Sequence, residues 1–538
     1  MREKEKEKKK SISNKVLGVL ILSLMGMAAG AQTAPKRPQL VVGIMVEGLN
    51  DDYLSLLGDY FTEGGFRRLM RDGATLSHLD YGPGVDAAAA TAIVFTGAAP
   101  SVNGIPSAKI YDDKAKKGVS VMLDPATMGN FTDETYSPSA ILVSTLGDEV
   151  RLDAAGTGWV YSVAPEPTQA IVMAGHAGNS AIWINNTKGT WATTTHYKDV
   201  PRAISARNYS RPLAAVLDTM VWTPLLAPTL YPDVPDYKKQ YPFRHSFPRK
   251  DIDRYERFNA SAKANTEVTA VAREYLSTMQ FGERGPVDML NLAYTLAPYP
   301  YTRDADNRME TLDSYLRLDR ELASLFATID KKVGAGNALI FLAGFPAQNT
   351  GPRDDEKWGV PSGEFSPRKA MSLLNMYLMA LHGNGDWVSG YFNRNFYLNS
   401  RLIKEHNLDA AAVRAEAAEF LTRMSGVSSV HTIDDIIAAR AGDNAQALKR
   451  NTSVSHSGDV IVNITPGWVI VDDDNTPDGV APAVARDAYI PSAAFIMGPG
   501  VKPQIIDTPV DARTIAPTIS RLLRIRSPNS ASLPALRL

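Results

Sequence analysis

A long apolar run near the start of the sequence constrains the fold more than any other feature. Residues 40–46 read Leu-Val-Val-Gly-Ile-Met-Val, with no alternation between polar and apolar side chains. Such a run is typical of a strand that is buried on both faces of a parallel sheet. Shorter or less pure runs of the same kind recur at 287–293, 338–343 and 493–497.

Helical patterns separate these runs. The clearest covers residues 313–333, where Leu316, Leu322 and Phe326 fall on one stripe and Gly334 marks the expected end. Strands that alternate with helices predict a doubly wound α/β sheet with helices on both faces.

Changes in composition suggest how the chain is organised. We expect the α/β core to occupy residues 36–347 and 455–538. The residues between, 348–454, are first polar and punctuated by Gly and Pro, then rich in Ala and Arg, and they predict an inserted α+β subdomain. Residues 228–249 are rich in Pro and Tyr and predict a long surface excursion.

The first residues, 1–31, have the features of an export signal. A basic beginning is followed by an apolar stretch at 16–28 and by Ala29-Gly30-Ala31, a small-x-small cleavage site. The apolar stretch is too short to span a bilayer comfortably, so we expect cleavage and no remaining membrane anchor. The protein is therefore predicted to be periplasmic or secreted.

Two bulk properties exclude classes of function. The formal net charge is −1, so nothing in it favours a nucleic-acid partner. The sequence contains no cysteine, which excludes disulfides, thiolate nucleophiles and Cys-based zinc sites.

Seven short stretches, in order along the chain, resemble one family. Together they are similar to the phosphate-irrepressible alkaline phosphatases and to the related nucleotide pyrophosphatase/phosphodiesterases of the alkaline phosphatase superfamily. The resemblance implies a three-layer α/β/α sandwich of the alkaline phosphatase type. It also implies two metal ions, usually zinc, that activate a Thr or Ser nucleophile. The stretches are Leu40–Tyr53, Gly64–Leu69, Phe95–Ile105, Tyr315–Leu322, Gly336–Leu342, Pro466–Trp468 and Thr514–Ile519.

The nucleophile implied by this resemblance is missing. Its position corresponds to Ala87, and the neighbouring choices, Asp86 and Ala88, carry no hydroxyl either. Thr91 is the nearest hydroxyl, more than one helical turn further along. We expect Asp86 to be the N-cap of an Ala-rich helix.

Most of the implied metal ligands are missing as well. Glu47, after the opening strand, keeps an acid that is one methylene longer than the family's Asp, and it is only a weak metal candidate. No His follows His456, so the family's last His ligand is absent. Zinc binds His nitrogen and carboxylate oxygen, which hydrocarbon and proline side chains do not offer. The family's two Asp and two His at the other positions are replaced by Leu296, Pro300, Phe345 and Pro346.

The implied phosphate-binding residues are changed too. A family Asn corresponds to Ala108, and the Lys-x-Arg pair that holds phosphate oxygens corresponds to Glu166 and Thr168. A carboxylate in place of a lysine repels a phosphate substrate at close range.

Other candidates favour structural interpretations. We expect His176, in a retained Ala-Gly-His stretch, to be structural. The run at 472–479 predicts a solvated acidic turn, because it lacks the bidentate Glu of a calcium-binding EF-hand. The sequence has no Gly-x-Ser-x-Gly elbow, Walker loop or His-Glu-x-x-His motif.

These observations favour a catalytically inactive pseudophosphatase that binds or scaffolds an unknown protein or small molecule and needs no cofactor. The alternative hypothesis is a divergent phosphoesterase that uses Glu47, Asp86 and Thr91, with one metal, such as zinc, or none. A third hypothesis is binding of an uncharged or cationic ligand at the former substrate site, which is now acidic and apolar.

Overall fold

The first apolar run forms strand β1 (Leu40–Glu47), which lies inside an 11-stranded sheet. β1 pairs in parallel with β11 (Asp288–Thr295) and β12 (Ala338–Phe345), and β12 pairs antiparallel with β20 (Ser492–Met497). All four predicted strands are thereby confirmed. The sheet order is β21-β2-β20-β12-β1-β11-β6-β7-β8-β5, with β22 paired to β2. The remaining strands are β2 (Ala74–Asp80), β5 (Gly129–Asn130), β6 (Val160–Ala164), β7 (Ser180–Ile184), β8 (Trp191–Thr194), β21 (Gln504–Ile506) and β22 (Val510–Asp511).

The computed structural model describes most of the chain, and residues 38–538 form one unit. The predicted export signal and part of the acidic turn lie outside the described residues. Among the described residues, no helix is both long and apolar enough to cross a membrane. The described residues are 37–538 except 199, 303–305, 348–358, 360–361, 440–443, 475–479, 481 and 486–491.

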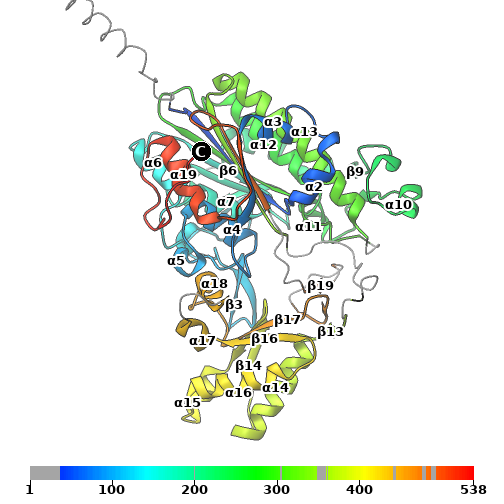
Figure 1. Cartoon of the computed structure of the whole chain (residues 1–538), viewed down its shortest axis with the longest axis vertical. Coiled ribbons are helices and arrows are strands. Elements are labelled where there is room, and N and C mark those ends of the chain that lie inside the picture. The colour runs from blue at the N-terminus through cyan, green and yellow to red at the C-terminus, as the bar shows by residue number, and fades with distance from the viewer. Residues whose placement is uncertain are drawn as a thin grey trace, which may run out of the picture. The chain divides into compact units, whose positions relative to one another are not determined.

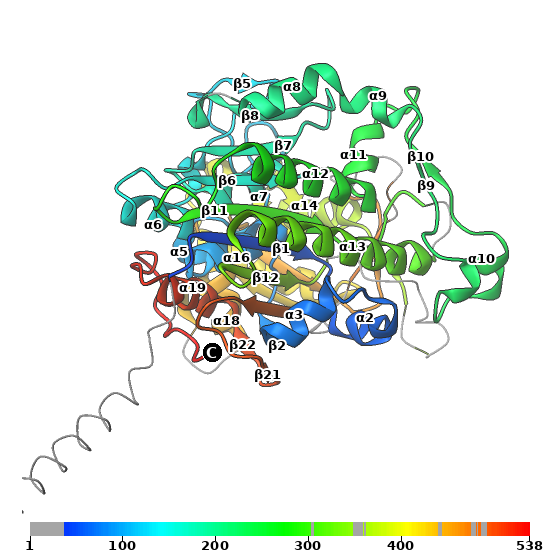
Figure 2. The same ribbon diagram turned by 90° about the horizontal axis from the view of Figure 1, so that it is seen from above.

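Helices cover both faces of the sheet, as predicted (Figures 1 and 2). Val42 and Ile44 of β1 belong to an apolar core with α3, α12 and α13, whereas Val41 and Met45 belong to a second core with α4, α6, α7 and α19. This alternation along β1 makes the three-layer sandwich. The helices are α3 (Phe66–Asp72), α4 (Ala87–Thr96), α6 (Leu146–Asp153), α7 (Pro167–Ala174), α12 (Ala262–Thr278), α13 (Arg308–Val333) and α19 (Ile515–Leu523).

Shorter elements connect these layers and α13 runs further than expected. α13 begins at Arg308 rather than near 313, and it ends at Gly334, whose φ is +88° and whose N–H donates to Asp330 O. The connecting elements are α2 (Asp51–Leu56), α5 (Pro100–Asn103), β3 (Lys109–Asp112), β4 (Lys117–Ser120), η2 (Pro138–Ala140), η3 (Thr195–Tyr197), α8 (Arg202–Ser210), α9 (Leu213–Leu217) and α11 (Arg254–Asn259).

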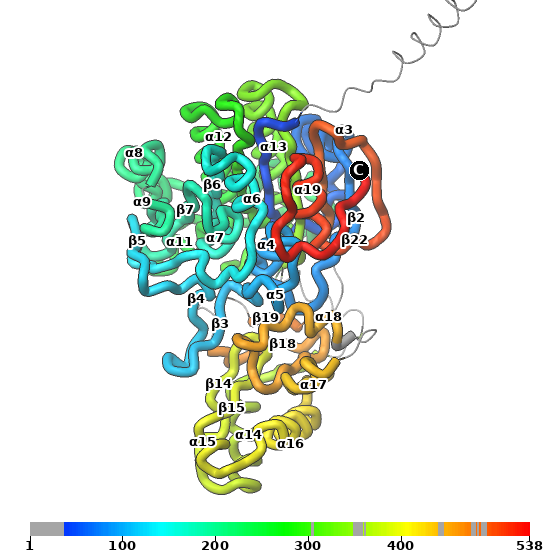
Figure 3. Tube along the Cα trace, turned by 90° about the vertical axis from the view of Figure 1, so that its left-hand side faces the viewer, coloured from blue at the N-terminus to red at the C-terminus, as the bar shows by residue number. Residues whose placement is uncertain are grey.

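The inserted subdomain has its own sheet, in the order β14-β15-β17-β16, and its own apolar core (Figure 3). β17 (Val460–Ile464) lies beyond residue 454 and pairs with β15 and β16. The subdomain therefore extends past the predicted boundary, and the chain returns to the central sheet at β20. The other elements are α14 (Pro367–His382), β14 (Val388–Phe392), β15 (Asn395–Leu398), α15 (Ser400–Glu405), α16 (Ala410–Thr422), β16 (Val427–Thr432), α17 (Ile433–Ala438) and α18 (Asn444–Asn451).

The predicted excursion at 228–249 is more firmly packed than a surface loop, because Tyr231, Phe243 and Phe247 are buried. One carboxylate anchors it. Asp313 is fully buried on α13 and accepts hydrogen bonds from Trp222 Nε1, Leu225 N and Tyr231 Oη, each at 2.6 Å. It also accepts one from Arg317 Nε at 2.6 Å. Short elements complete this region: β9 (Val221–Trp222), η4 (Pro228–Leu230), α10 (Asp236–Gln240) and β10 (His245–Ser246).

We predict that Asp313→Ala lowers the free energy of unfolding by about 3–5 kcal/mol, because it removes the shared acceptor of the buried Trp222 and Tyr231 donors and the carboxylate partner of Arg317. Urea-induced unfolding measures the loss, and limited proteolysis within 219–249 reports where it occurs. Asp133→Ala is the control: its carboxylate is exposed and pairs with Lys188, so the unfolding midpoint should not change. Equal effects of the two substitutions would contradict this account.

Candidate functional site

The positions singled out on β1, β11 and β12 meet at one edge of the sheet. Glu47 is the last residue of β1, and the parallel register aligns it with Thr295 and Phe345. Thr295 Oγ1 lies 3.4 Å from Glu47 Oε2, and Leu296 N donates to Glu47 O at 2.7 Å. Ligands in α/β sheets bind outside the carboxyl ends of the strands, so we expect a ligand site at this edge.

The chain after β1 approaches the chain after β11 closely at Gly48. Gly48 has a φ of +75°, and a Cβ atom there would lie 2.8 Å from Ala297 N. Only glycine fits this conformation and this approach. Tyr315 Oη donates to Gly48 O at 2.6 Å and accepts from Asn50 N at 2.7 Å, which fixes the turn behind Glu47.

The N-terminus of α4 lies at the same site. Asp86 is its N-cap, as predicted, and accepts from Ala89 N at 2.9 Å. The second oxygen of Asp86 accepts from Ala108 N at 2.7 Å, although the two residues lie far apart in the sequence. Ala87 and Ala108 are thus brought together, and at both positions the side chain is only a methyl group.

The two hydroxyls considered near this site are buried. Thr91 is 0% exposed; its Oγ1 donates to Ala87 O at 2.7 Å and lies 3.5 Å from Gln169 Nε2. Thr168, in the first turn of α7, is also buried. Neither hydroxyl is open to a substrate in this conformation.

Apolar packing occupies two of the implied metal-ligand positions. Leu296 and Phe345 are each 1% exposed and belong to the two apolar cores on opposite faces of the sheet. Pro300 and Pro346 are partly exposed. In the described part of the chain, no group of three or more His, Asp or Glu side chains could hold a metal ion. The residues present therefore do not fit the pair of zinc ions that the family implies.

Most of the charged side chains at this site are acidic. Glu47 is partly exposed, and its pKa is raised to about 7, first by loss of hydration and then by the charge of Asp86. The hydrogen bond from Thr295 opposes this rise. A carboxyl group that titrates near neutrality suits proton transfer, but an ionised one repels phosphate.

Glu166 is the second carboxyl of this region. The residue is exposed. Loss of hydration, followed by the charges of Glu134 and Glu47, raises the pKa of Glu166 to about 7, and Lys109 opposes the rise. Glu166 precedes α7 and makes no side-chain cap there.

Glu134 was not identified from the sequence. It accepts hydrogen bonds from Trp183 Nε1 at 2.6 Å and Thr132 Oγ1 at 2.9 Å, beside the end of the sheet at β7. No motif surrounds it, and its position depends on the pairing of β5 with β8. Thr295 was also overlooked, although a hydroxyl as the last residue of a buried strand is a detectable signal.

The structure shows the surroundings of His176 and of part of the predicted acidic turn. His176 contacts Asp148 and a backbone carbonyl, away from the residues of this site, as a structural role requires. In the acidic turn, Asp474 forms an ion pair with Arg368, and Asp472 accepts from Ser366 Oγ. The remainder of that turn, from 475 to 479, lies outside the described residues.

Comparisons with known proteins agree on one family. The family model of type I phosphodiesterase/nucleotide pyrophosphatase matches residues 41–488. The alkaline phosphatase PafA of Elizabethkingia meningoseptica is 28% identical over 540 residues, covering 96% of this chain and 97% of PafA. The alkaline phosphatase PhoV of Synechococcus elongatus is 27% identical, covering 92% of each chain.

Solved structures agree with the sequence comparisons. The crystal structure of PafA matches with a TM-score of 0.80 and 26% identity, over 94% of this chain and 99% of that one. A PafA variant, in which a threonine, an asparagine, a lysine and an arginine are replaced, matches with a TM-score of 0.79. The predicted fold of the alkaline phosphatase type is confirmed.

We predict that Glu47→Gln stabilises the protein at alkaline pH. Because the folded-state pKa of Glu47 is about 7 and its ordinary value is 4.5, ionisation opposes folding as pH rises between these values. The thermal midpoint of Glu47→Gln should therefore match or lie below that of the wild type at pH 4.5 and exceed it at pH 8. Thermal unfolding in a pH series measures the difference. Glu63→Gln, whose side chain is 74% exposed, is the control and should show no such trend; a lower midpoint of Glu47→Gln at pH 8 would refute the prediction.

Proposed function

We propose that this chain, which belongs to the type I phosphodiesterase/nucleotide pyrophosphatase family, is a pseudophosphatase that binds or scaffolds a partner instead of hydrolysing phosphoesters. One observation carries the proposal. Leu296 and Phe345, at two implied metal-ligand positions, are buried among core side chains and offer no donor atom. Without the two metals, the family's means of activating a nucleophile and stabilising the transferring phosphoryl group are missing.

The replaced residues of the PafA variant support the proposal. Its threonine and asparagine are separated by as many residues as Ala87 and Ala108 here, and its lysine and arginine flank a single residue, as Glu166 and Thr168 do. This chain thus has alanines at the first two positions and no cation at the other two. Ala87 and Ala108 are also neighbours in space, through Asp86.

The electrostatics of the site also argue against a phosphate ligand. The charge of Asp86 raises the pKa of Glu47, and the charge of Glu47 raises that of Glu166, so Glu47 lies within electrostatic range of both other carboxyl groups. An uncharged or cationic small molecule, or a protein surface, suits such a site better than a phosphate dianion. We place this activity in the periplasm or outside the cell, because of the export signal expected at 1–31.

A second candidate is a divergent phosphoesterase, and the pKa of Glu47 favours it. A carboxyl group that titrates at about 7 can exchange a proton with a substrate near neutral pH. In this case Glu47 would be the principal oxygen ligand for a single zinc ion. Thr91 is a poor nucleophile here because its hydroxyl is buried and donates to Ala87 O.

We predict that the mature protein, incubated with zinc, calcium and magnesium and then dialysed, holds well under one equivalent of each metal by elemental mass spectrometry. Hydrolysis of nitrophenyl phosphate and of its diester should equal the buffer rate, and millimolar phosphate should not raise the thermal midpoint. Glu47→Gln and Asp86→Ala, purified in parallel, are the controls. A rate shared by all three proteins identifies a contaminant.

The opposite results would overturn the pseudophosphatase proposal. About two equivalents of tightly held zinc would show that other residues form the family's metal site. Hydrolysis that falls in Glu47→Gln and Asp86→Ala would establish the divergent phosphoesterase, and hydrolysis that falls in Thr91→Ala would give Thr91 a role in it.

A further inference from the structure

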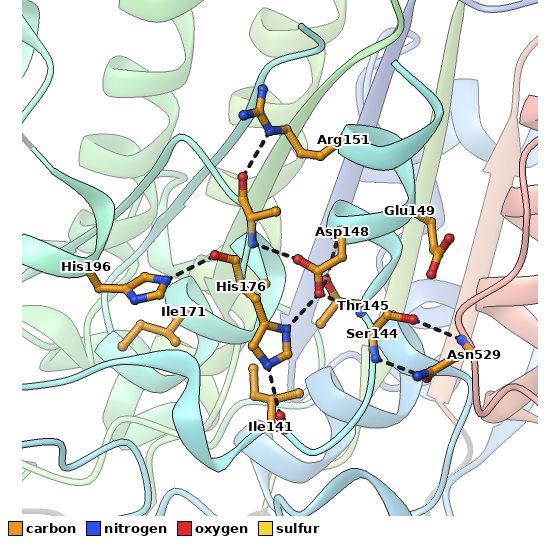
Figure 4. Close-up of polar contacts among 12 residues, drawn as sticks. Ile141, Ser144, Thr145, Asp148, Glu149, Arg151, Ile171, His176, His196 and Asn529 are labelled. Carbon is orange, nitrogen blue, oxygen red and sulfur yellow. Dashed lines mark hydrogen bonds and ion pairs between the residues drawn. The ribbon is translucent and has the colours of Figure 1, made fainter. Parts of the chain in front are cut away.

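His176 has an unusual set of contacts, and it lies past the C-terminal end of α7, whereas Glu166 and Thr168 lie at its N-terminal end. It follows α7 after Gly175, and Figure 4 shows its ring between Asp148 and Ile141. Nδ1 lies 2.9 Å from Asp148 Oδ2, and Nε2 lies 2.9 Å from Ile141 O. A carboxylate and a carbonyl only accept hydrogen bonds. Both ring nitrogens must therefore carry a proton, and the imidazole in this arrangement is the cation.

Asp148 is fixed as an acceptor by its other contacts. It is the N3 residue of a capping box at the start of α6, in which its carboxylate accepts from Thr145 N at 2.9 Å. It also accepts from Ala177 N at 2.8 Å. These bonds, together with the bond from His176, lower the pKa of Asp148 despite its burial. The carboxylate is thus ionised and holds the Nδ1 proton of His176.

The second contact of His176 reaches residues 138–145, which we call the latch loop. Ile141 is buried, but the next residue, Leu142, is 70% exposed. Apart from His176, polar contacts hold this loop: Leu142 N donates to Asn103 O at 3.0 Å, and Ser144 pairs with Asn529. Ile141 and Val143 are also held by burial, so it is the less buried Leu142 and Ser144 whose positions depend on these hydrogen bonds.

The latch loop in turn contacts the C-terminal segment, residues 524–538. Ser144 N donates to Asn529 Oδ1 at 3.1 Å, and Asn529 N donates to Ser144 Oγ at 2.9 Å (Figure 4). Nearby, Arg526 makes a bidentate bond, at 2.9 and 3.0 Å, to Glu149, whose side chain is 2% exposed. The latch loop and the C-terminal segment therefore contact each other, and both contact α6 or the residues that begin it.

We propose that His176 is a proton-operated latch: its doubly protonated ring holds the latch loop, and through Ser144 the C-terminal segment, against α6. When the ring loses a proton, the ionised Asp148 keeps the one on Nδ1. The lone pair of Nε2 then faces Ile141 O at 2.9 Å, where two acceptors repel each other, and the latch loop is released.

The direction of the pH dependence follows from the pKa shifts. The bond to Asp148 raises the pKa of His176 above its ordinary 6.5, burial opposes the rise, and the charge of Asp148 and the bond to Ile141 add to it. The contribution of His176 to stability is therefore complete below about 6.5 and is lost as pH rises through the raised value. The contribution of Asp148, whose pKa is lowered, is lost only in acid below 3.8. The latch is closed in mild acid and opens in alkali.

Other titratable groups around His176 contact its backbone or its neighbours, not its ring. His196 Nε2 lies 3.0 Å from His176 O, and Arg151 Nε donates to Ala177 O at 3.0 Å. Tyr197 Oη donates to Gly175 O at 2.9 Å. The charge of His196 helps to lower the pKa of Asp124, and Glu149 is bound to Arg526. None of these groups supplies a substitute for the Nε2 proton.

Hydrogen exchange on the whole mature protein tests the proposal. After correction for intrinsic rates, protection of the amides of Leu142, Ser144 and Asn529 should fall roughly tenfold between pH 6 and pH 9, while β1 remains protected. In His176→Gln, which cannot gain a proton, protection of these amides should be low and independent of pH. The matched control, His196→Gln, should keep the wild-type pH dependence.

A titration of the wild type keeps the proposal testable if His176→Gln does not fold. The ring C–H signals of His176, followed by NMR, should move with the same midpoint as the change in exchange. Protection that does not vary with pH in the wild type, a pH dependence that persists in His176→Gln, or two different midpoints would each overturn the proposal.

Discussion

The parallel register of β1 with β11 and β12 determines where everything in the candidate site lies. Because these strands pair residue for residue to their last positions, Glu47, Thr295 and Phe345 end at the same level of the sheet. Leu296 and Gly48 then complete the turn with backbone hydrogen bonds to the neighbouring strands. Backbone pairing, not side-chain chemistry, determines the positions of the residues at this edge of the sheet. These positions can therefore stay the same when the side chains differ.

Apolar side chains at this edge contribute to folding in a different way from metal ligands. A metal site requires carboxylates and imidazoles to be held close together, which opposes folding until a cation neutralises them. Leu296 and Phe345 bury apolar surface at the same positions and need no cation. Glu47 and Glu166 do carry an electrostatic cost when they ionise, because their pKa values are raised.

Local patterns predicted the parts of this molecule that depend on local physics. The four apolar runs form strands, Gly334 ends α13, and Asp86 caps α4. Features that depend on distant pairing were missed. β17 joins the sheet of the predicted subdomain only through its pairing with β15 and β16, so the sequence did not reveal that this sheet runs past residue 454. Similarly, the sequence shows His176 but not the two acceptors that surround it, which come from separate elements.

The subdomain inserted between β12 and β20 has a kinetic consequence. β20 lies between β2 and β12 and pairs with both, yet the whole subdomain separates it from β12 in sequence. Until residues 492–497 have been synthesised, β12 is an edge strand that exposes unpaired backbone groups, and β2 has no partner, because β21 and β22 follow later still. Contacts of such long range form slowly, because a large loop must close first. The nascent chain therefore passes through a stage with an open sheet edge at β12 and an unpaired β2, and rapid folding of the inserted subdomain would shorten this stage by bringing β12 and β20 together.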